Sequence, residues 1–243
     1  MTLFGLLKKK QCWCLTLRAR MLLIGAAAAG MAVAGIFIHP FLALQSRVEG
    51  DILVVEGWLP DYALGMAASE FTAHPYKRIV TIGGPLENGF YLAEFRTYAE
   101  LSAAGLVKLG VNPGLVTAVP APSVVKDRTY TSFRALKQWI DRSGLQVRSL
   151  NVFTLGTHAR RSRLLCRMAL KNAVPVGIIS ARSSDYDPRR WWRTSSGVNA
   201  VLHEIIACLY TKLFFTAPDS GPPSPFGKAG FSSGQERTRQ WMY

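Results

Sequence analysis

"LNVFTLGTHARRSRLLCRMAL" (Leu150–Leu170) is the stretch of sequence that decides the fold class. An apolar run ends at Gly156, and apolar residues at helical spacing follow it almost directly. A short buried strand that turns at once into a helix is the repeating unit of a parallel sheet covered by helices. The same order of patterns recurs along the chain, so the sequence predicts an α/β fold, a Rossmann-like sandwich with a mostly parallel sheet.

The other strands and helices of this alternation can be located by the same patterns. Four more short apolar runs are typical of buried strands: Asp51–Gly57, Arg78–Pro85, "GLVTAVPAP" (114–122) and "VPVGIIS" (174–180). Apolar spacing predicts helices over Leu92–Leu109, "KDRTYTSFRALKQWIDRSG" (126–144), "THARRSRLLCRMALKN" (157–172) and "VNAVLHEIIACLYTKLFF" (198–215). In the second of these, Gly144 is a typical stop signal just beyond the helix end.

The N-terminal region carries an apolar segment of membrane-spanning length. Met21–Ile38 contains only apolar residues, Ala and Gly, and five Lys or Arg residues precede it. Cations collect on the cytoplasmic side of a membrane span. We therefore predict a single-pass anchor in the cell inner or plasma membrane, with a cytoplasmic N-terminus. A cleavable signal peptide is the alternative, because "AVA" at Ala32–Ala34 resembles a signal-peptidase site.

The anchor divides the chain into four predicted parts. They are a cytoplasmic basic tail (1–20), one transmembrane helix (21–44), an extracytoplasmic α/β domain (47–216) and a flexible tail rich in Pro, Gly and Ser (217–243). The net charge of +14 indicates an anionic partner. Because the domain is exported, nucleic acid is not expected. The expected partners are the membrane and an anionic or phosphate-bearing envelope ligand.

The last predicted helix is strongly apolar but does not suit a second membrane span. It is short, and it contains His203, Glu204 and Lys212. The prediction is that it packs against the sheet, and the alternative is that it lies on the membrane surface. Cys166 and Cys208 lie among apolar residues of two predicted helices, so buried free thiols are expected, with a disulfide between them as the alternative.

Candidate functional residues follow the ends of the predicted strands. Parallel sheets bind ligands at the carboxyl ends of their strands, and four of the five strands here end in polar or glycine-rich loops. Gly83 and Gly84 follow the second strand and would let backbone amides approach a ligand. The other candidates are Glu56, Asp127, Arg128, Thr129, Thr157, His158, Arg160 and Arg161.

The helix that begins after Gly156 is predicted to bind an anion. Its N-terminus, near Thr157 or His158, would point backbone N–H groups at the ligand edge. Cations at this end of a helix are disfavoured by the helix dipole, so Arg160 and Arg161 together indicate an anion that offsets the cost. We expect Arg160 and the helix N-terminus to hold the anion. The alternative is a solvated basic face.

His158 is the predicted acid or base, with Glu56 or Asp127 orienting its ring. Asp127 precedes a helix, so an N-cap is the alternative for that residue. No HExxH, GxGxxG, GxxxxGK[ST] or GxSxG motif occurs in the chain. The sequence therefore predicts no metal site, argues against dinucleotide binding and serine hydrolysis, and assigns no cofactor.

Several motifs over residues 50–215 resemble the YdcF/SanA/ElyC-like family of bacterial envelope proteins. They are "DILVVEG", "IVTIGG", "DRTYTSFRAL", "LGTHARRSRLL" and a final tryptophan-led helix with Glu204, all after an N-terminal anchor. The most specific part is a strand, a short loop with His158, and Arg160 two residues on. Relatives tend to carry an Asn-Thr-x-Glu-Asn type stretch at one helix start, where "DRTYTS" keeps Thr129 but lacks the glutamate.

The resemblance implies a Rossmann-type domain at the membrane and a role in peptidoglycan or envelope maintenance. It also implies S-adenosylmethionine as a ligand of one member, so a methyltransferase is a further, weaker hypothesis. The leading expectation is an envelope protein that binds and acts on a phosphate-bearing, lipid-linked ligand. The alternative is a non-enzymatic module that binds an envelope partner through the same basic edge. An enzyme requires His158 and a carboxylate within about 3 Å of each other, directly or through one water, whereas a binding module does not.

Overall fold

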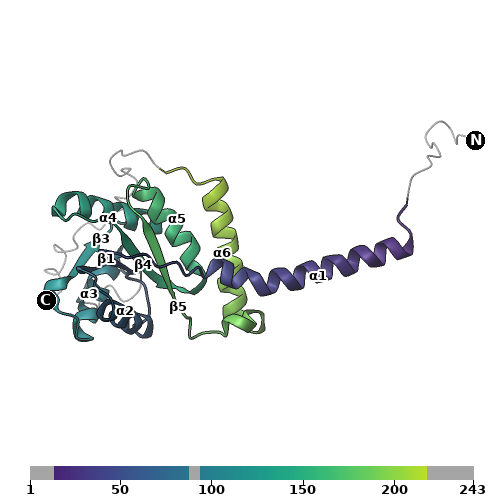
Figure 1. Cartoon of the computed structure of the whole chain (residues 1–243), viewed down its shortest axis with the longest axis horizontal. Helices are drawn as coiled ribbons and strands as arrows, with labels where there is room; N and C mark the ends of the chain where they lie inside the picture. The colour runs from purple at the N-terminus through teal and green to yellow at the C-terminus, as the bar shows by residue number, and fades with distance from the viewer. Residues whose placement is uncertain (1–13, 88–93, 218–243) are drawn as a thin grey trace, which may run out of the picture.

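Within residues 14–87 and 94–217, which the computed structural model describes, five parallel strands form one sheet (Figure 1). The strands are β1 (Ile52–Glu56), β2 (Arg78–Gly83), β3 (Val116–Pro120), β4 (Leu150–Leu155) and β5 (Val176–Ala181). They lie in the order β3-β2-β1-β4-β5, and every neighbouring pair is parallel. The predicted fold class, an α/β Rossmann-like sandwich, is confirmed.

Helices cover both faces of this sheet. The described residues form α1 (Leu17–Leu42), α2 (Asp61–Ala73), α3 (Tyr98–Lys108), α4 (Arg128–Ser143), α5 (Ala159–Ala169) and α6 (Ser195–Leu213). Short 3₁₀ turns occur at η1 (Pro113–Leu115), η2 (Gly156–His158) and η3 (Pro188–Arg193). Gly144 follows the end of α4 in the left-handed conformation, as expected of a stop signal.

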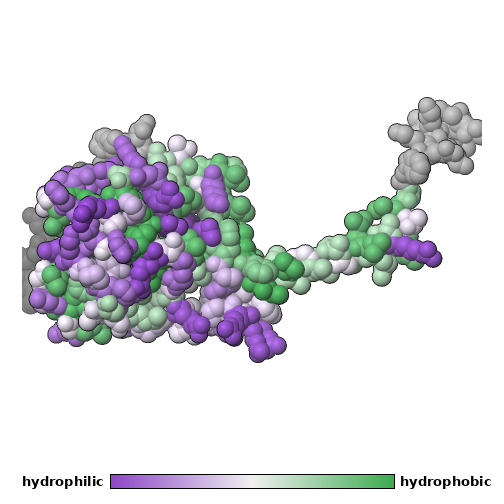
Figure 2. Space-filling model, viewed as in Figure 1, coloured by the Kyte–Doolittle hydropathy of each residue, from purple (hydrophilic) through white to green (hydrophobic). Residues whose placement is uncertain are grey.

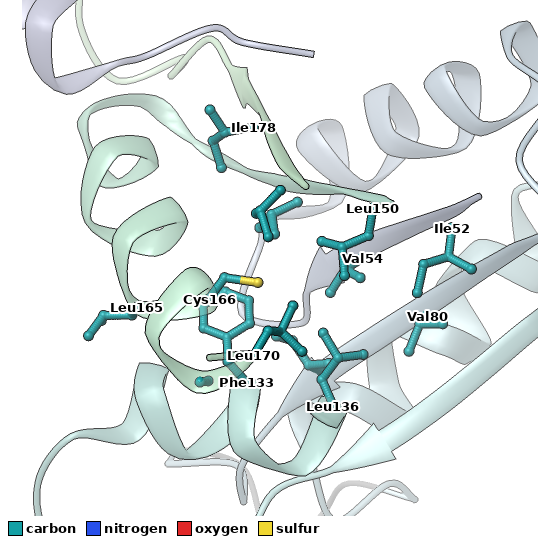
Figure 3. Close-up of a cluster of buried hydrophobic side chains, with 14 of the residues drawn as sticks. Ile52, Val54, Val80, Phe133, Leu136, Leu150, Leu165, Cys166, Leu170 and Ile178 are labelled. Carbon is teal, nitrogen blue, oxygen red and sulfur yellow. The ribbon is translucent and has the colours of Figure 1, made fainter. Parts of the chain in front are cut away.

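Alternation along the central strand supplies one apolar core to each face. On one side, Ile52 and Val54 pack with Phe133 and Leu136 of α4 and with Cys166 of α5 (Figure 3). On the other side, the intervening residues of β1 pack against α2 and α3. Because both faces are covered, every residue of β1 is buried.

Helix α2 is absent from the sequence prediction. Its buried face consists largely of small side chains, among them Ala63, Ala67 and Ala68. Alanine is compatible with both buried and exposed positions, so such a face gives little periodic contrast between apolar and polar residues.

Helix α3 begins later than predicted, at Tyr98 instead of Leu92. The start is fixed by a capping box between Thr97 and Glu100. The Thr97 hydroxyl accepts from the Glu100 N–H, and the Glu100 carboxylate accepts from the Thr97 N–H. Residues 88–93, which include the start of the predicted helix, lie outside the described residues.

Helix α1 is the one helix among the described residues that is long and apolar enough to cross a membrane. It has 26 residues, and at about 1.5 Å per residue its length exceeds a hydrocarbon core of about 30 Å. It begins at Leu17, before the predicted anchor, and ends at Leu42, which is buried against the domain. Residues 1–13 and 218–243, most of the two predicted tails, lie outside the described residues.

The segment between α1 and β1 is hydrogen-bonded along the sheet. Ser46 and Ile178 of β5 exchange two backbone hydrogen bonds of 2.9 Å. The side chain of Asn151, which is fully buried in β4, accepts from the Val48 N–H at 3.0 Å and donates to the Val48 carbonyl at 2.8 Å. Gly177 leaves room for this side chain, because a Cβ there would lie 1.9 Å from the Asn151 Oδ1.

Helix α6 lies beside the sandwich and packs mainly against α5, η2, η3 and α1. A small core joins Leu42 of α1 with Val201 and Cys208 of α6. The prediction that this helix packs against the sheet is therefore corrected: its main partners are other helices and turns. Cys166 and Cys208 are buried free thiols.

Gly57 is expected to be required where β1 leaves the sheet. A Cβ at this position would lie 2.5 Å from the Tyr98 carbonyl oxygen, and backbone cannot yield cheaply there. Gly57→Ala should lower the free energy of unfolding by about 2 kcal/mol. Gly65→Ala is the matched control, because nothing lies within 4 Å of a Cβ there and a helical alanine gains up to about 1 kcal/mol. Denaturant unfolding should shift in opposite directions for the two variants; equal shifts would contradict this account.

Candidate active site

A cavity of about 590 Å³ lies at the carboxyl ends of the strands, where the strand order reverses between β1 and β4. Such a reversal opens a crevice, because the connections that leave the two strands run to opposite sides. Residues after β1, β2 and β3 and the first turns of α4 and α5 line the cavity. Helix α6 contributes His203 and Glu204 to the lining.

Strand β1 brings Glu56 to the cavity. The residue is only 3% exposed, and its carboxylate accepts hydrogen bonds from two hydroxyl groups. The Thr154 hydroxyl of β4 donates to Oε2, and the Ser162 hydroxyl of α5 donates to Oε1 at 3.0 Å. These bonds fix the carboxylate, with Oε1 at 3.7 Å from the Nε2 of His158.

His158 lies at the end of η2 and is held by Glu204. Its Nδ1 lies 2.7 Å from the Glu204 Oε1. An ionised carboxylate can only accept, so a hydrogen bond at this distance requires Nδ1 to carry the proton. Nη2 of Arg161 also lies 2.9 Å from Nδ1, but a guanidinium only donates, so this contact is not a hydrogen bond once Nδ1 is protonated. In the neutral ring the lone pair is therefore on Nε2.

The Nε2 of His158 is the one buried side-chain nitrogen or oxygen in residues 14–87 and 94–217 that lacks a hydrogen-bond partner. Buried polar atoms nearly always have a hydrogen-bond partner, so an unpartnered nitrogen at a cavity wall is unusual. The ring of Trp58 meets the imidazole edge to face, with centroids 5.2 Å apart. Trp58 and Glu56 thus flank a proton acceptor that no described protein group uses.

Arg161 completes the cluster by a two-point ion pair with Glu204. Its Nε and Nη2 donate to the two carboxylate oxygens, each at 2.9 Å, and both side chains are largely buried. Burial alone would raise the pKa of the Glu204 carboxyl, but hydrogen bonds from Arg161 and His158 outweigh it and lower that pKa to about 2. Glu204 is therefore ionised at neutral pH, which keeps His158 in one orientation.

Most of the residues predicted from the sequence line this cavity. They are Glu56, Gly83, Gly84, Arg128, Thr129, His158 and Arg161. The Arg128 side chain is 68% exposed and forms an ion pair with Glu87, another lining residue. Its guanidinium can therefore be released to a ligand at lower cost than that of the buried Arg161.

Three residues predicted to belong to the site lie elsewhere: Arg160, Thr157 and Asp127. The first of them was predicted to hold the anion. Arg160 does not line the cavity: its Nε donates to the Phe41 carbonyl, and its guanidinium lies over the Phe41 ring, 3.7 Å from the centroid. The expectation that Arg160 holds the anion is thus overturned, because this side chain is used at the end of α1.

Thr157 and Asp127 are also absent from the cavity lining. Thr157 is buried, and its hydroxyl donates to the Ala200 carbonyl of α6. Asp127 precedes α4 in the left-handed conformation, at φ 61°, and its side chain makes no capping hydrogen bond. Asp127 was predicted to orient His158 or to cap the helix, and it does neither. Glu204 is the residue that orients the histidine.

Glu204 was not predicted as a site residue, although the family resemblance includes it in the last helix. It lies 46 positions from His158, in a helix whose pattern indicates burial. One signal was available: a glutamate among apolar residues of a packed helix requires a partner, because an unpaired buried carboxylate is costly. The arginines that follow His158 were candidates for that partner.

A scan against protein-family models finds no match to this chain, and a search of curated proteins finds no similar sequence. Within the described ranges, no group of three or more His, Cys, Asp or Glu side chains has the arrangement of a metal site.

Proposed function

We propose that the protein is a membrane-anchored cell-envelope enzyme, of the kind found in the YdcF/SanA/ElyC-like family, which binds a phosphate-bearing ligand and acts on it with His158 as general base. One observation carries the proposal: Nε2 of His158 is unpaired at the wall of a cavity while Glu204 holds Nδ1 at 2.7 Å. A carboxylate that orients a histidine whose other nitrogen faces a ligand space is a recurrent arrangement for proton transfer.

In the proposed reaction, Nε2 takes the proton of a water or hydroxyl group as its oxygen attacks phosphorus. The new O–P bond forms as the bond from phosphorus to the leaving oxygen breaks. The imidazolium then lies between two carboxylates, 2.7 Å from Glu204 and 3.7 Å from Glu56, which stabilise its charge. The leaving oxygen, on the opposite side of phosphorus, takes a proton from solvent, and the imidazolium releases its Nε2 proton to solvent, so His158 returns to the neutral state.

The phosphate of the ligand is assigned to Arg128. This side chain lies at the start of α4 on the cavity wall, and its ion pair with Glu87 involves two exposed groups. Exposed pairs contribute only about 0–1 kcal/mol, so a phosphate can replace Glu87 at little cost. Arg161, in contrast, is committed to Glu204 through two buried hydrogen bonds.

The membrane assignment rests on α1. It is apolar along its length, none of its membrane-length segment is buried in the protein, and Arg18 and Arg20 lie at its N-terminal end. Together with the cations that precede it, this supports a single-pass anchor in the inner or plasma membrane with the N-terminus in the cytoplasm. The catalytic domain would then face the envelope, where lipid-linked phosphates are available at the membrane.

A ligand screen tests the proposal. The full chain in detergent should be stabilised by one of the following: a polyprenyl diphosphate, a polyprenyl phosphate, inorganic pyrophosphate or a nucleotide. S-adenosylmethionine is included for the methyltransferase alternative. A ligand at 100 times its Kd adds about 2.7 kcal/mol, or roughly 5–10 °C in Tm for a domain of this size.

Two arginine variants show whether the cavity is responsible. Arg128→Ala should weaken binding of the phosphorylated ligand by about 10- to 100-fold, the effect of losing one hydrogen-bonded charge. Arg160→Ala is the matched control and should bind normally, because its guanidinium lies over Phe41. Ligand turnover, followed by phosphate release, separates an enzyme from the non-enzymatic binding module. Normal binding by Arg128→Ala, or binding without turnover of any ligand, would count against the proposal.

A further inference from the structure

The outer face of α6 is an exposed apolar surface. Leu202, Ile206, Leu209 and Leu213 recur at helical spacing and are each at least 50% exposed. Tyr210 and Phe214 lie beside this stripe, with their rings 6.3 Å apart. We use the term outer face of α6 for these six residues. A contiguous apolar surface of this kind on a folded domain indicates contact with another apolar phase.

This face lies at the end of the domain from which α1 leaves. Leu42 and Ile38 of α1 pack with Val201 and Cys208 on the inner side of α6. In Figure 1, α6 runs across the direction of α1 at that end. Figure 2 shows that the hydrophobic surface over α6 continues into that of α1. With α1 along the bilayer normal, α6 would therefore lie parallel to the membrane surface, as interfacial amphipathic helices do.

The turn η3, next to α6, has the composition of a membrane interface. The Trp191 indole N–H donates to the Gly35 carbonyl of α1 at 2.9 Å. Trp192 is 48% exposed, and Arg189, Arg190 and Arg193 are exposed as well. Trp at the headgroup level, with Arg side chains that reach phosphate groups, is typical of a chain segment in the interface.

The position of Gly35 along α1 also places Trp191 and η3 in the membrane interface. A span of about 20 residues counted from Met21 ends near Pro40, so Gly35 lies roughly 8 Å inside that end at 1.5 Å per residue. Because Trp191 is bonded to Gly35, η3 reaches the boundary between headgroups and acyl chains. Interfacial helices place their apolar face at about this depth.

We propose that the outer face of α6, together with η3, is embedded in the interfacial layer of the membrane that α1 spans. This inference rests on the anchoring in the proposed function and extends it. His203 and Glu204 line the cavity from the same helix, so the cavity comes to lie beside the headgroup layer. A ligand can then place its phosphate in the cavity while its lipid chain stays in the bilayer.

A lipid-quenching experiment on the full chain tests this placement. The protein carries one polarity-sensitive fluorophore on an introduced cysteine, in a background with Cys12→Ser and Cys14→Ser; Cys166 and Cys208 are buried. It is labelled in detergent and reconstituted into phosphatidylcholine–phosphatidylglycerol vesicles that contain increasing amounts of a lipid with a nitroxide near the top of its acyl chain. The test position is Ile206→Cys, on the outer face of α6.

Two further positions make the outcomes distinguishable. Val33→Cys, in the exposed surface of α1, reports the anchoring itself; Leu101→Cys, on α3 at the end of the domain away from α1, is the exposed control (Figure 1). We expect quenching at positions 33 and 206 and none at 101. Quenching at 33 alone would overturn the inference while leaving the anchor intact. Absence of quenching at 33 would instead refute the anchoring.

The emission wavelength of the fluorophore at position 206, taken together with the quenching, shows whether lipid or protein covers the outer face of α6. A fluorophore at position 206 that is shielded from water but not quenched by the nitroxide lipid would be covered by a second copy of the chain. That result would overturn the lipid assignment. Emission typical of water at position 206, unchanged by the nitroxide, would show that the face is solvated and would also overturn it.

Discussion

Substitution of His158 by alanine is expected to lower kcat for the phosphorylated ligand by about 10²- to 10⁴-fold, the usual contribution of a positioned general base. Binding of the ligand should change little, because the phosphate is assigned to Arg128. The fold should also persist: Nε2 makes no hydrogen bond in the described structure, and Arg161 continues to neutralise Glu204 when the imidazole is removed. The measurement is a steady-state comparison of kcat and KM for the full chain.

A second histidine provides the control for this variant. His74 lies after the end of α2, where it contacts Glu70 and Arg47, away from the cavity. His74→Ala should therefore keep the wild-type kcat. The general-base assignment fails if His158→Ala retains full turnover, or if its turnover falls only in proportion to loss of folded protein, as judged from its unfolding curve.

Removal of the Glu204 carboxylate is expected to have the largest effect on stability. Glu204→Ala leaves the Arg161 guanidinium buried without its two hydrogen bonds, and breaking a buried pair from one side costs about 3–5 kcal/mol. The double variant Arg161→Ala, Glu204→Ala removes both charges. Its loss should be smaller than the sum of the two single losses, because it leaves no uncompensated charge. Chemical denaturation of the four proteins measures this coupling; additive losses would contradict it.

The same carboxylate predicts how stability depends on pH. The folded-state pKa of Glu204 is about 2, below its ordinary value of 4.5. A depressed pKa contributes stability above pH 4.5 that is lost as the pH falls toward 2. At 1.4 kcal/mol per pH unit this amounts to about 3 kcal/mol. Glu204→Gln should be less stable at pH 6 but should lack this part of the acid loss. Parallel curves for the two proteins between pH 6 and pH 2 would be inconsistent with the ion pair.

The sheet could be predicted because its strands are buried on both faces. Apolar runs such as Ile52–Glu56 and Leu150–Leu155 end at glycine, and the alternation with helices leaves few topologies. Helix α2 could not be predicted in this way, because its buried face consists largely of alanines, which give little periodic contrast. The start of α3 was readable in principle: Thr97 followed by Glu100 is a capping-box sequence, but helical spacing continues upstream of it.

The candidate site was only partly predictable, because its last members depend on packing between distant segments. The rule that ligands bind at strand ends leads to Glu56 and His158 from the sequence alone. Nothing local distinguishes Arg160 from Arg161, since both lie in the first turn of one helix. Their roles are decided by what each one meets, the Phe41 carbonyl in one case and Glu204 in the other.

The hydrogen bonds along residues 43–51 determine how far the candidate active site can move relative to α1. Ser46 is bonded to β5, and Val48 is held at both its N–H and its carbonyl by Asn151, so no slack chain separates α1 from the sheet. With α1 in a bilayer, the domain would be held rigidly at the end of the span and not by a flexible linker. For the function proposed above, the domain would meet its substrate by two-dimensional diffusion, at one height above the membrane. Molecules that pass farther out in the envelope would stay beyond its reach.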